Sequence, residues 1–254
     1  MKNRWFVQAG LYNGAPLDDR SAAQVLGGER PQLRPPAFSE TDGKDATFSY
    51  TYYPGGSEIP EAVAPNIRTR SYAIEATVSN AGAEIKGVLM AHGGRFGGHS
   101  FYIHEGKLCY VYNWLGQQQQ KITCPLPSLN SQEMTLKVEF AKEKTIAPPD
   151  ENLGSSTVGN VKLYINNIEQ TTTLLEGTFT GYFDKFLTQP GKFALSGEGF
   201  NIGRDAGQPV STDYENDVPY EFEGAKLKKV IVTIQNDAGA IDYEKELRGM
   251  LMRD

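Results

Sequence analysis

Residues 86–114 read KGVLMAHGGRFGGHSFYIHEGKLCYVYNW. Three runs in which apolar side chains recur at every second position are separated by two short segments that contain glycine. This is the pattern of half-buried strands joined by tight turns. Between the last two runs, His104-Glu105-Gly106-Lys107 places residues that tolerate positive φ, as a two-residue hairpin loop requires. The stretch therefore predicts consecutive antiparallel strands joined by hairpins.

The same alternation recurs along most of the chain. Asn166-Asn167 predicts a second two-residue hairpin loop. Gly, Asn or Pro separates most of the runs, and short spacing of this kind is typical of antiparallel sheets rather than of parallel sheets with crossover helices. We expect an all-β fold, an antiparallel β-sandwich of the jelly-roll type with short terminal helices. The other predicted strands lie at 46–53, 71–79, 134–142, 160–165, directly after Asn167, and at 222–235.

The predicted sandwich domain occupies residues 46–236. Before it, residues 1–45 are expected to form a short helix at 5–13 and an extended strap rich in proline and glycine. After it, residues 237–254 carry an apolar stripe at helical spacing, which predicts a helix packed on the sandwich. The segment 146–156 is expected to be an exposed loop.

Composition narrows the classes of partner. The chain has 31 Asp and Glu against 25 Lys and Arg, a net charge of −6, and no long run of either sign. A broad basic surface for a phosphate backbone is therefore not expected, and neither is nucleic acid. We also expect no signal peptide and no transmembrane segment, because no run approaches the ~20 apolar residues that span a bilayer. The sequence predicts a soluble chain and leaves its compartment unassigned.

Cys109 and Cys124 are the two cysteines of the chain. A turn centred on Gly116 and Gln117 predicts that Cys109 lies opposite Cys124, and Val111 opposite Ile122, on one face. A disulfide or two buried free thiols would fit this placement. We favour free thiols, because a cross-strand disulfide needs a non-hydrogen-bonded pair with suitable Cβ separation.

The glycine-flanked segment between the first two runs contains His92, Arg95, Phe96 and His99. If the two histidines lie on neighbouring strands, their imidazoles converge and a metal site is conceivable. A third ligand at readable spacing is missing, whereas a zinc site needs three or four. We therefore favour a tight sheet corner whose side chains face a ligand or a partner.

Acidic residues gather in residues 197–222. Asp205, Asp213 and Asp217 are predicted ligands for Ca²⁺, which takes six to eight oxygens in flexible geometry. Pairing of Arg204 with a nearby carboxylate is the alternative. The nearby carboxylates also raise the possibility of sugar hydrolysis by an acid pair, but the segment lacks an acid-rich strand motif.

The last of the three quoted runs is rich in aromatic residues. Tyr110, Tyr112 and Trp114 share one face of the predicted strand. On an exposed face, Tyr112 and Trp114 would form a stacking platform for sugar rings. We favour the alternative that they fill the core, because aromatic side chains supply much of the buried area of a sandwich.

Three long strings resemble the C-terminal region of large bacterial-type arylsulfatases. They are YYPGGSEIPEAVAPNIRTRSYAIEATV (52–78), GVLMAHGGRFGGHSFYIHEGKLCYVYNWLG (87–116) and GEGFNIGRDAGQPVSTDY (197–214). The resemblance implies a concanavalin A-like or laminin G-like sandwich. Sulfatase catalysis needs a Cys/Ser-x-Pro-x-Arg motif, and Cys124-Pro125-Leu126-Pro127-Ser128 departs from it.

The resemblance therefore implies a non-catalytic binding or docking module without catalytic residues of its own. Sulfated or anionic glycans are the expected ligands. One alternative is a structural subunit of a larger assembly. Another is a separated part of an active sulfatase, whose catalytic domain would be carried by a partner chain.

Overall fold

A computed structural model describes residues 43, 46–61, 64–79, 84–127, 133–146, 156–176, 185–188 and 199–237. The chain divides into two compact units, Met1–Ala37 and Phe38–Asp254, and every described residue belongs to the second unit. The predicted helix at 5–13, the predicted helix at 237–254 apart from Asp237, most of the strap and the centre of the 146–156 loop lie outside the described residues.

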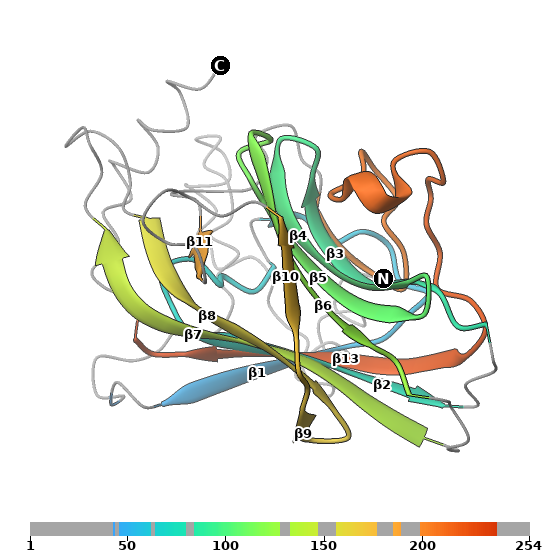
Figure 1. Cartoon of the computed structure of the whole chain (residues 1–254), viewed down its shortest axis with the longest axis horizontal. Coiled ribbons are helices and arrows are strands. Elements are labelled where there is room, and N and C mark those ends of the chain that lie inside the picture. The colour runs from blue at the N-terminus through green and yellow to red at the C-terminus, as the bar shows by residue number, and fades with distance from the viewer. Residues whose placement is uncertain are drawn as a thin grey trace, which may run out of the picture. The chain divides into compact units, whose positions relative to one another are not determined.

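The described part of the chain forms two antiparallel sheets (Figure 1). The seven-stranded sheet has the order β1-β13-β2-β7-β8-β11, with β9 paired to β8. Its strands are β1 (Thr47–Tyr52), β2 (Tyr72–Ser79), β7 (Glu133–Ile146), β8 (Ser156–Ile165), β9 (Ile168–Glu169), β11 (Phe186–Thr188) and β13 (Lys226–Gln235).

The six-stranded sheet has the order β10-β6-β5-β4-β3-β12. Its strands are β3 (Gly87–Gly94), β4 (Gly97–His104), β5 (Lys107–Trp114), β6 (Gln118–Pro125), β10 (Thr173–Glu176) and β12 (Phe200–Ile202). The antiparallel jelly-roll sandwich expected from the alternation is confirmed. The strands that the alternation did not predict, β10, β11 and β12, have only four, three and three residues, too few to show a period of two.

Both predicted two-residue hairpin loops are confirmed. His104 pairs with Lys107, and the loop residues Glu105 and Gly106 have φ of 47° and 69°. Asn166 and Asn167 have φ of 50° and 63° between the paired ends of β8 and β9. Two successive positive φ values match the right-handed twist of the flanking strands, which is why Gly106, Asn166 and Asn167 suit their positions.

The predicted pairing of β5 with β6 is wrong by one residue. Trp114 pairs with Gln118, so the loop has three residues rather than two, and Cys109 pairs with Thr123 instead of Cys124. Val111 likewise pairs with Lys121 rather than Ile122. Because a shift of one residue moves a side chain to the other face, the two cysteines lie on opposite faces of the sheet. Both are buried free thiols, as favoured above.

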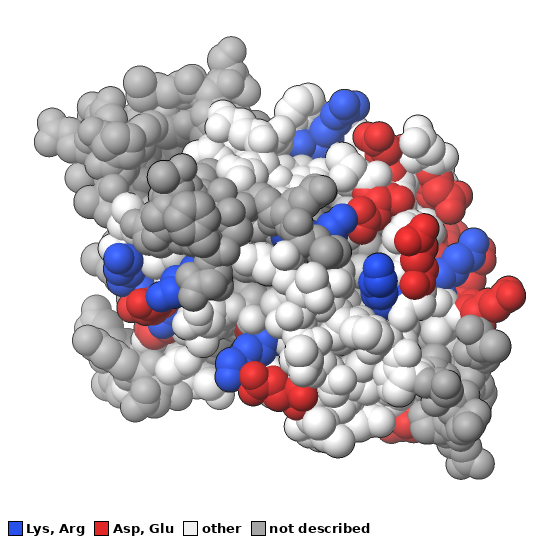
Figure 2. Space-filling model, in the orientation of Figure 1, with Lys and Arg blue, Asp and Glu red and all other residues white. Residues whose placement is uncertain are grey.

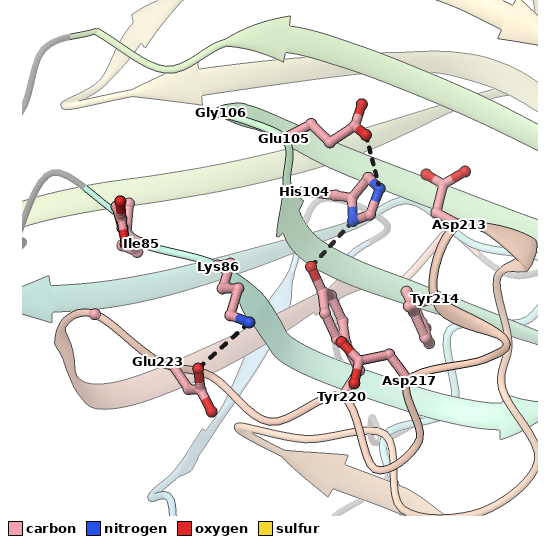
Figure 3. A pocket seen from close by; sticks show the side chains of 12 residues that line it. Ile85, Lys86, His104, Glu105, Gly106, Asp213, Tyr214, Asp217, Tyr220 and Glu223 are labelled. Atoms are coloured by element: carbon pink, nitrogen blue, oxygen red, sulfur yellow. Dashed lines mark hydrogen bonds and ion pairs between the residues drawn. The ribbon is translucent and has the colours of Figure 1, made fainter.

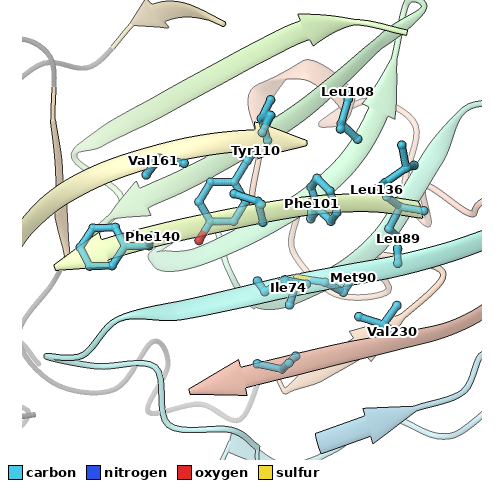
Figure 4. Packing of buried hydrophobic residues seen from close by; sticks show 14 of the residues in the cluster. Ile74, Leu89, Met90, Phe101, Leu108, Tyr110, Leu136, Phe140, Val161 and Val230 are labelled. Carbon is cyan, nitrogen blue, oxygen red and sulfur yellow. The ribbon is translucent and has the colours of Figure 1, made fainter. Parts of the chain in front are cut away.

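The main core lies between the two sheets (Figure 4). Ile74, Leu136, Val138 and Val230 reach it from the seven-stranded sheet, and Met90, Phe101, Leu108 and Tyr110 reach it from the six-stranded sheet. Alternate positions of one strand contribute to this core, which explains the period of two in the sequence.

A second apolar cluster lies on the outer face of the six-stranded sheet. Residues 203–224, which we call the covering segment, place Val210, Tyr214 and Tyr220 over this face. The sheet residues beneath them are Val88, Ala91, Tyr102, Cys109 and Val111. Most of β3, β4 and β5 is therefore buried on both faces, whereas the alternation predicted one buried face.

In the described part of the chain, no helix has the length and apolar character needed to cross a membrane.

Candidate functional site

A hollow lies between the covering segment and the turn that joins β4 to β5 (Figure 3). Its volume is about 1010 Å³. The residues that line it come from three parts of the chain: 84–86 ahead of β3, 104–106 at the β4–β5 turn, and residues 213, 214, 217, 220, 223 and 224 of the covering segment. The hollow is thus built where a rigid hairpin meets a segment fixed on the sheet.

Tyrosines anchor the covering segment to the sheet. The Tyr214 hydroxyl is hydrogen-bonded to Asp205 Oδ2 at 2.8 Å and to Ser100 Oγ at 2.9 Å. The Tyr214 and Tyr220 rings are stacked, with centroids 4.8 Å apart and an interplanar angle of 11°. Tyr102 meets Tyr214 edge-on from the sheet, at a centroid separation of 5.2 Å. Buried aromatic area and hydrogen bonds together hold one wall of the hollow in place.

Asp213 forms a second anchor. Its carboxylate accepts hydrogen bonds from Lys121 Nζ at 2.5 Å and from the Tyr102 hydroxyl at 2.6 Å. Burial acts to raise the pKa of Asp213, but the hydrogen bonds from Lys121 and Tyr102 outweigh it and hold the pKa below its ordinary value. Burial, with smaller effects of Cys109 and Asp213, holds the pKa of Tyr102 well above its ordinary value. Asp213 is therefore charged, and Tyr102 keeps its proton at neutral pH.

Three polar contacts lie at the rim of the hollow (Figure 3). His104 Nδ1 is 3.0 Å from the Tyr220 hydroxyl, and His104 Nε2 is 3.9 Å from Glu105 Oε1. On the other side, Lys86 Nζ is 3.5 Å from Glu223 Oε2. The rim thus offers a lysine donor, carboxylate acceptors and an imidazole whose orientation is fixed by Tyr220.

The charge of the lining is mainly negative. Five lining residues are carboxylic acids and one is a lysine. Figure 2 shows acidic side chains gathered on the right of the face, in the region where Figure 1 places the covering segment, with some basic side chains among them. The acids are Glu84, Glu105, Asp213, Asp217 and Glu223.

The two histidines of the glycine-flanked segment converge, as predicted. His92 pairs with His99 across β3 and β4, and their ring centroids are 5.6 Å apart. Both rings are buried, His99 beside the Tyr110 hydroxyl and His92 against the Phe200 ring. Burial lowers the pKa of His99 to about 3 and holds that of His92 well below its ordinary value. Enclosed in this way, they do not line the hollow.

Tyr112 and Trp114 share a face with Tyr110, as the alternation predicted, but that face is turned to the main core. Tyr112 is 1% exposed, and Trp114 packs against the core cluster. Their assignment to an exposed stacking platform is therefore wrong, and the favoured alternative, core packing, is confirmed.

Arg95 and Phe96 form the tip of the β3–β4 hairpin, and the predicted sheet corner is confirmed. Both are exposed, Phe96 to 69%. Beneath them, the buried Asn113 donates from Nδ2 to the carbonyl oxygens of Arg95 at 3.0 Å and Val210 at 3.1 Å, and its Oδ1 accepts from the Gly116 amide at 3.1 Å. One side chain thus joins two hairpin tips to the covering segment.

The three predicted calcium ligands do not form one group, because Asp213 and Asp217 line the hollow but Asp205 does not. Asp205 is buried and accepts from the Val210 amide and the Tyr214 hydroxyl, Asp213 is bonded to Lys121, and Asp217 is exposed at the hollow. Within the described ranges, no three His, Cys, Asp or Glu side chains gather in a group that could hold a metal ion.

Sequence reasoning missed most of the hollow. Glu84, Lys86, His104 and Glu105 were not predicted as site residues, because they are far in sequence from the acidic segment that they face. One signal was present. Val88, Tyr102, Cys109 and Val111 put large apolar side chains on the face of the quoted strands opposite the main core, which indicates a cover on that face.

Among known proteins, the chain is similar to solved structures. No protein-family profile and no curated protein matches the chain. One similar solved structure is the CBM40 of the Ruminococcus gnavus IT-sialidase bound to α2,3 sialyllactose, with a TM-score of 0.39, 15% identity, and coverage of 82% of this chain and 100% of that one.

Two further neighbours are the heptameric SAP-like pentraxin from Limulus polyphemus and the Caenorhabditis elegans galectin LEC-6. The pentraxin has a TM-score of 0.34 and 11% identity over 83% of both chains. The galectin has a TM-score of 0.35 and 10% identity, covering 72% of this chain and 94% of that one. At these identities and TM-scores the similarity assigns no function.

Proposed function

We propose that this chain is a non-catalytic binding module, and that the hollow binds a polyhydroxylated ligand of the saccharide class. The observation that carries the proposal is the convergence of polar side chains from three separate parts of the chain on one hollow. Lys86, His104 and Asp217 represent the three parts. Convergent polar groups at a concave surface are the usual basis of small-ligand recognition.

The polar groups of the rim suit sugar hydroxyls. A hydroxyl both donates and accepts, so it pairs with carboxylate acceptors such as Glu105 and with a lysine donor such as Lys86. His104 is held by Tyr220, and Lys86 by Glu223, before any ligand arrives. Side chains ordered in advance lose less entropy on binding, which favours affinity.

Titration with a panel of oligosaccharides, followed by NMR chemical shifts of the backbone amides, tests the proposal. We expect shifts in residues 84–86, 104–106 and 213–224, and their loss in the variant His104→Ala. The variant Phe96→Ala is the matched control, because Phe96 lies outside the lining of the hollow. A panel that shifts no amide around the hollow would disprove the proposal.

Calcium binding stays a prediction. Asp217 is the one exposed member of the three predicted ligands, so an ion would have to recruit other oxygens. Repeating the titration with and without Ca²⁺, together with calorimetry of Ca²⁺ alone, checks whether the ion binds and whether saccharide binding needs it.

Docking to a larger assembly is the second candidate function, and the exposure of Phe96 favours it. An aromatic side chain that stays exposed on a tip fixed by Asn113 is preordered for insertion into a partner surface. The variant Phe96→Ala should then weaken assembly and leave saccharide binding unchanged. A chain that is monomeric and captures no partner in a Phe96-dependent way would count against docking.

The relationship to arylsulfatases is a further proposal, supported by the three strings quoted above and by agreement of the sandwich with the fold that they imply. It predicts that a chain carrying a Cys-x-Pro-x-Arg motif binds this one. Sulfatase turnover should require that second chain. Turnover by this chain alone would contradict both the relationship as drawn and the assignment as a non-catalytic module.

A further inference from the structure

From the charge distribution in the hollow we infer that it selects saccharides that carry a protonated amine and discriminates against anionic ones. The inference rests on the proposed function, because it concerns the same site. It reverses the expectation of sulfated or anionic glycans that the sequence resemblance suggested.

The positions of the negative charges favour a cationic ligand. Glu84, Glu105 and Asp217 are exposed, and each belongs to a different part of the chain that lines the hollow. The Glu105 side chain is 76% exposed. A ligand that enters the hollow therefore meets carboxylates from three parts of the chain.

The two nearby lysines are already paired with carboxylates. Lys86 Nζ is 3.5 Å from Glu223 Oε2, and Lys121 Nζ is 2.5 Å from Asp213 Oδ1. An anionic ligand would have to compete with these carboxylates for either lysine. Glu105 and Asp217 also line the hollow, and their carboxylates are acceptors for a cationic ligand.

Other groups of the site suit the sugar ring itself. His104 and Tyr220 supply hydrogen-bonding groups and the edge of an aromatic ring, which contact hydroxyls and ring carbons whatever the charge of the sugar. The hollow thus combines groups that bind the sugar ring with charges that distinguish its substituent. An amino sugar, which has both features, fits this combination.

The test compares glucosamine oligosaccharides, at a mildly acidic pH at which the amine is protonated, with the same oligosaccharides after N-acetylation. The two ligands share every ring hydroxyl and differ at the nitrogen, which is a charged ammonium in one and a neutral acetamide in the other. We expect tighter binding of the amine form, by calorimetry and by NMR shifts at the hollow. Exposed ion pairs are each worth about 1.5- to 5-fold in affinity. The difference should shrink in high salt, which screens exposed charges.

Variants locate the preference. Glu105→Gln and Asp217→Asn should each reduce the preference for the amine form, measured as the ratio of the two affinities, by about 1.5- to 5-fold. Glu215→Gln is the matched control, because it makes the same change of charge at an exposed residue outside the lining. If Glu215→Gln reduced the preference as much, net charge rather than the hollow would be responsible, and the inference would be overturned.

The outcomes separate this inference from the proposed function. Equal binding of both forms at the hollow, or tighter binding of sialylated or sulfated oligosaccharides, would overturn the charge selection and leave saccharide binding in place. Failure of every saccharide to shift amides around the hollow would overturn the proposed function and the inference with it.

Discussion

At the scale of single residues, burial strongly lowers the pKa values of the two histidines that pair across β3 and β4. Neither imidazole reaches solvent, and each ring lies among aromatic side chains in the interior. A buried imidazole is stable in its neutral form, so the pair stabilises the fold only while it stays uncharged.

Acid should therefore destabilise the protein through these residues. The pKa of His99 is about 3 in the folded state against an ordinary 6.5, so the unfolded chain binds more protons in this interval. The free energy of unfolding should fall as the pH drops from about 6.5 towards 3, by up to about 1.4 kcal/mol per pH unit for each buried histidine. Urea unfolding at a series of pH values measures this change in the free energy of unfolding. A shallower dependence is expected for His99→Phe, and equal slopes in the two proteins would contradict the assignment.

The charge of Asp213 is stabilised by the side chains of Lys121 and Tyr102. Asp213→Asn weakens its hydrogen bonds from Lys121 and Tyr102 and leaves the Lys121 ammonium without its counter-charge. We expect a loss of about 1–3 kcal/mol in the free energy of unfolding, because both side chains are largely shielded from water.

The control for Asp213 is Glu223→Gln, which removes the carboxylate of a more exposed pair with Lys86. Exposed pairs contribute about 0.2–1 kcal/mol, so this variant should unfold at nearly the same urea concentration as the parent. Equal losses in the two variants would mean that burial does not strengthen the Asp213 contacts.

At the scale of elements, the hairpin loops decide which faces the strands present. Two-residue loops with successive positive φ were readable from Glu105-Gly106 and Asn166-Asn167. The three-residue β5–β6 loop could not be read from the sequence. Its residue Leu115 adopts a φ of 54°, a conformation that few branched residues accept. Gly116 in the same loop also lies close to the β3–β4 tip, where a Cβ atom would be 2.9 Å from the Arg95 carbonyl oxygen. The loop geometry thus depends on a neighbouring hairpin.

Asn167 offers a direct test of the β8–β9 turn. It is exposed and has a φ of 63°, so Asn167→Val should destabilise the protein by about 1–2 kcal/mol, because a β-branched side chain disfavours this conformation. Asn167→Gly, which removes the conformational penalty, should be neutral or stabilising. Thermal unfolding of both variants measures the difference, and equal effects would contradict the assigned turn.

At the scale of the whole described structure, the covering segment buries the outer face of β3, β4 and β5 in the six-stranded sheet. Tyr214 is 2% exposed and contacts the sheet through its ring and its hydroxyl. The segment builds one wall of the hollow, so the stability of the fold and the shape of the site are linked.

Two substitutions separate the contributions of Tyr214. Tyr214→Phe keeps the ring and should cost about 1–3 kcal/mol through the lost hydrogen bonds to Asp205 and Ser100. Tyr214→Ala also removes the buried ring and should cost about 3–5 kcal/mol. Urea unfolding gives both values, and limited proteolysis should cut residues 203–224 faster in the alanine variant. An alanine variant as stable as the parent would contradict the described packing.

The sequence by itself determined the class of fold, most of the strands and two hairpin loops, because a period of two and residues that favour positive φ are local properties of the chain. Only the tertiary structure decided which face of β5 meets the main core, that Cys109 and Cys124 lie on opposite faces, and that His104, Glu105 and Asp217 line one hollow. These features depend on the pairing register and on contacts between residues more than a hundred positions apart, and no short stretch of sequence encodes either.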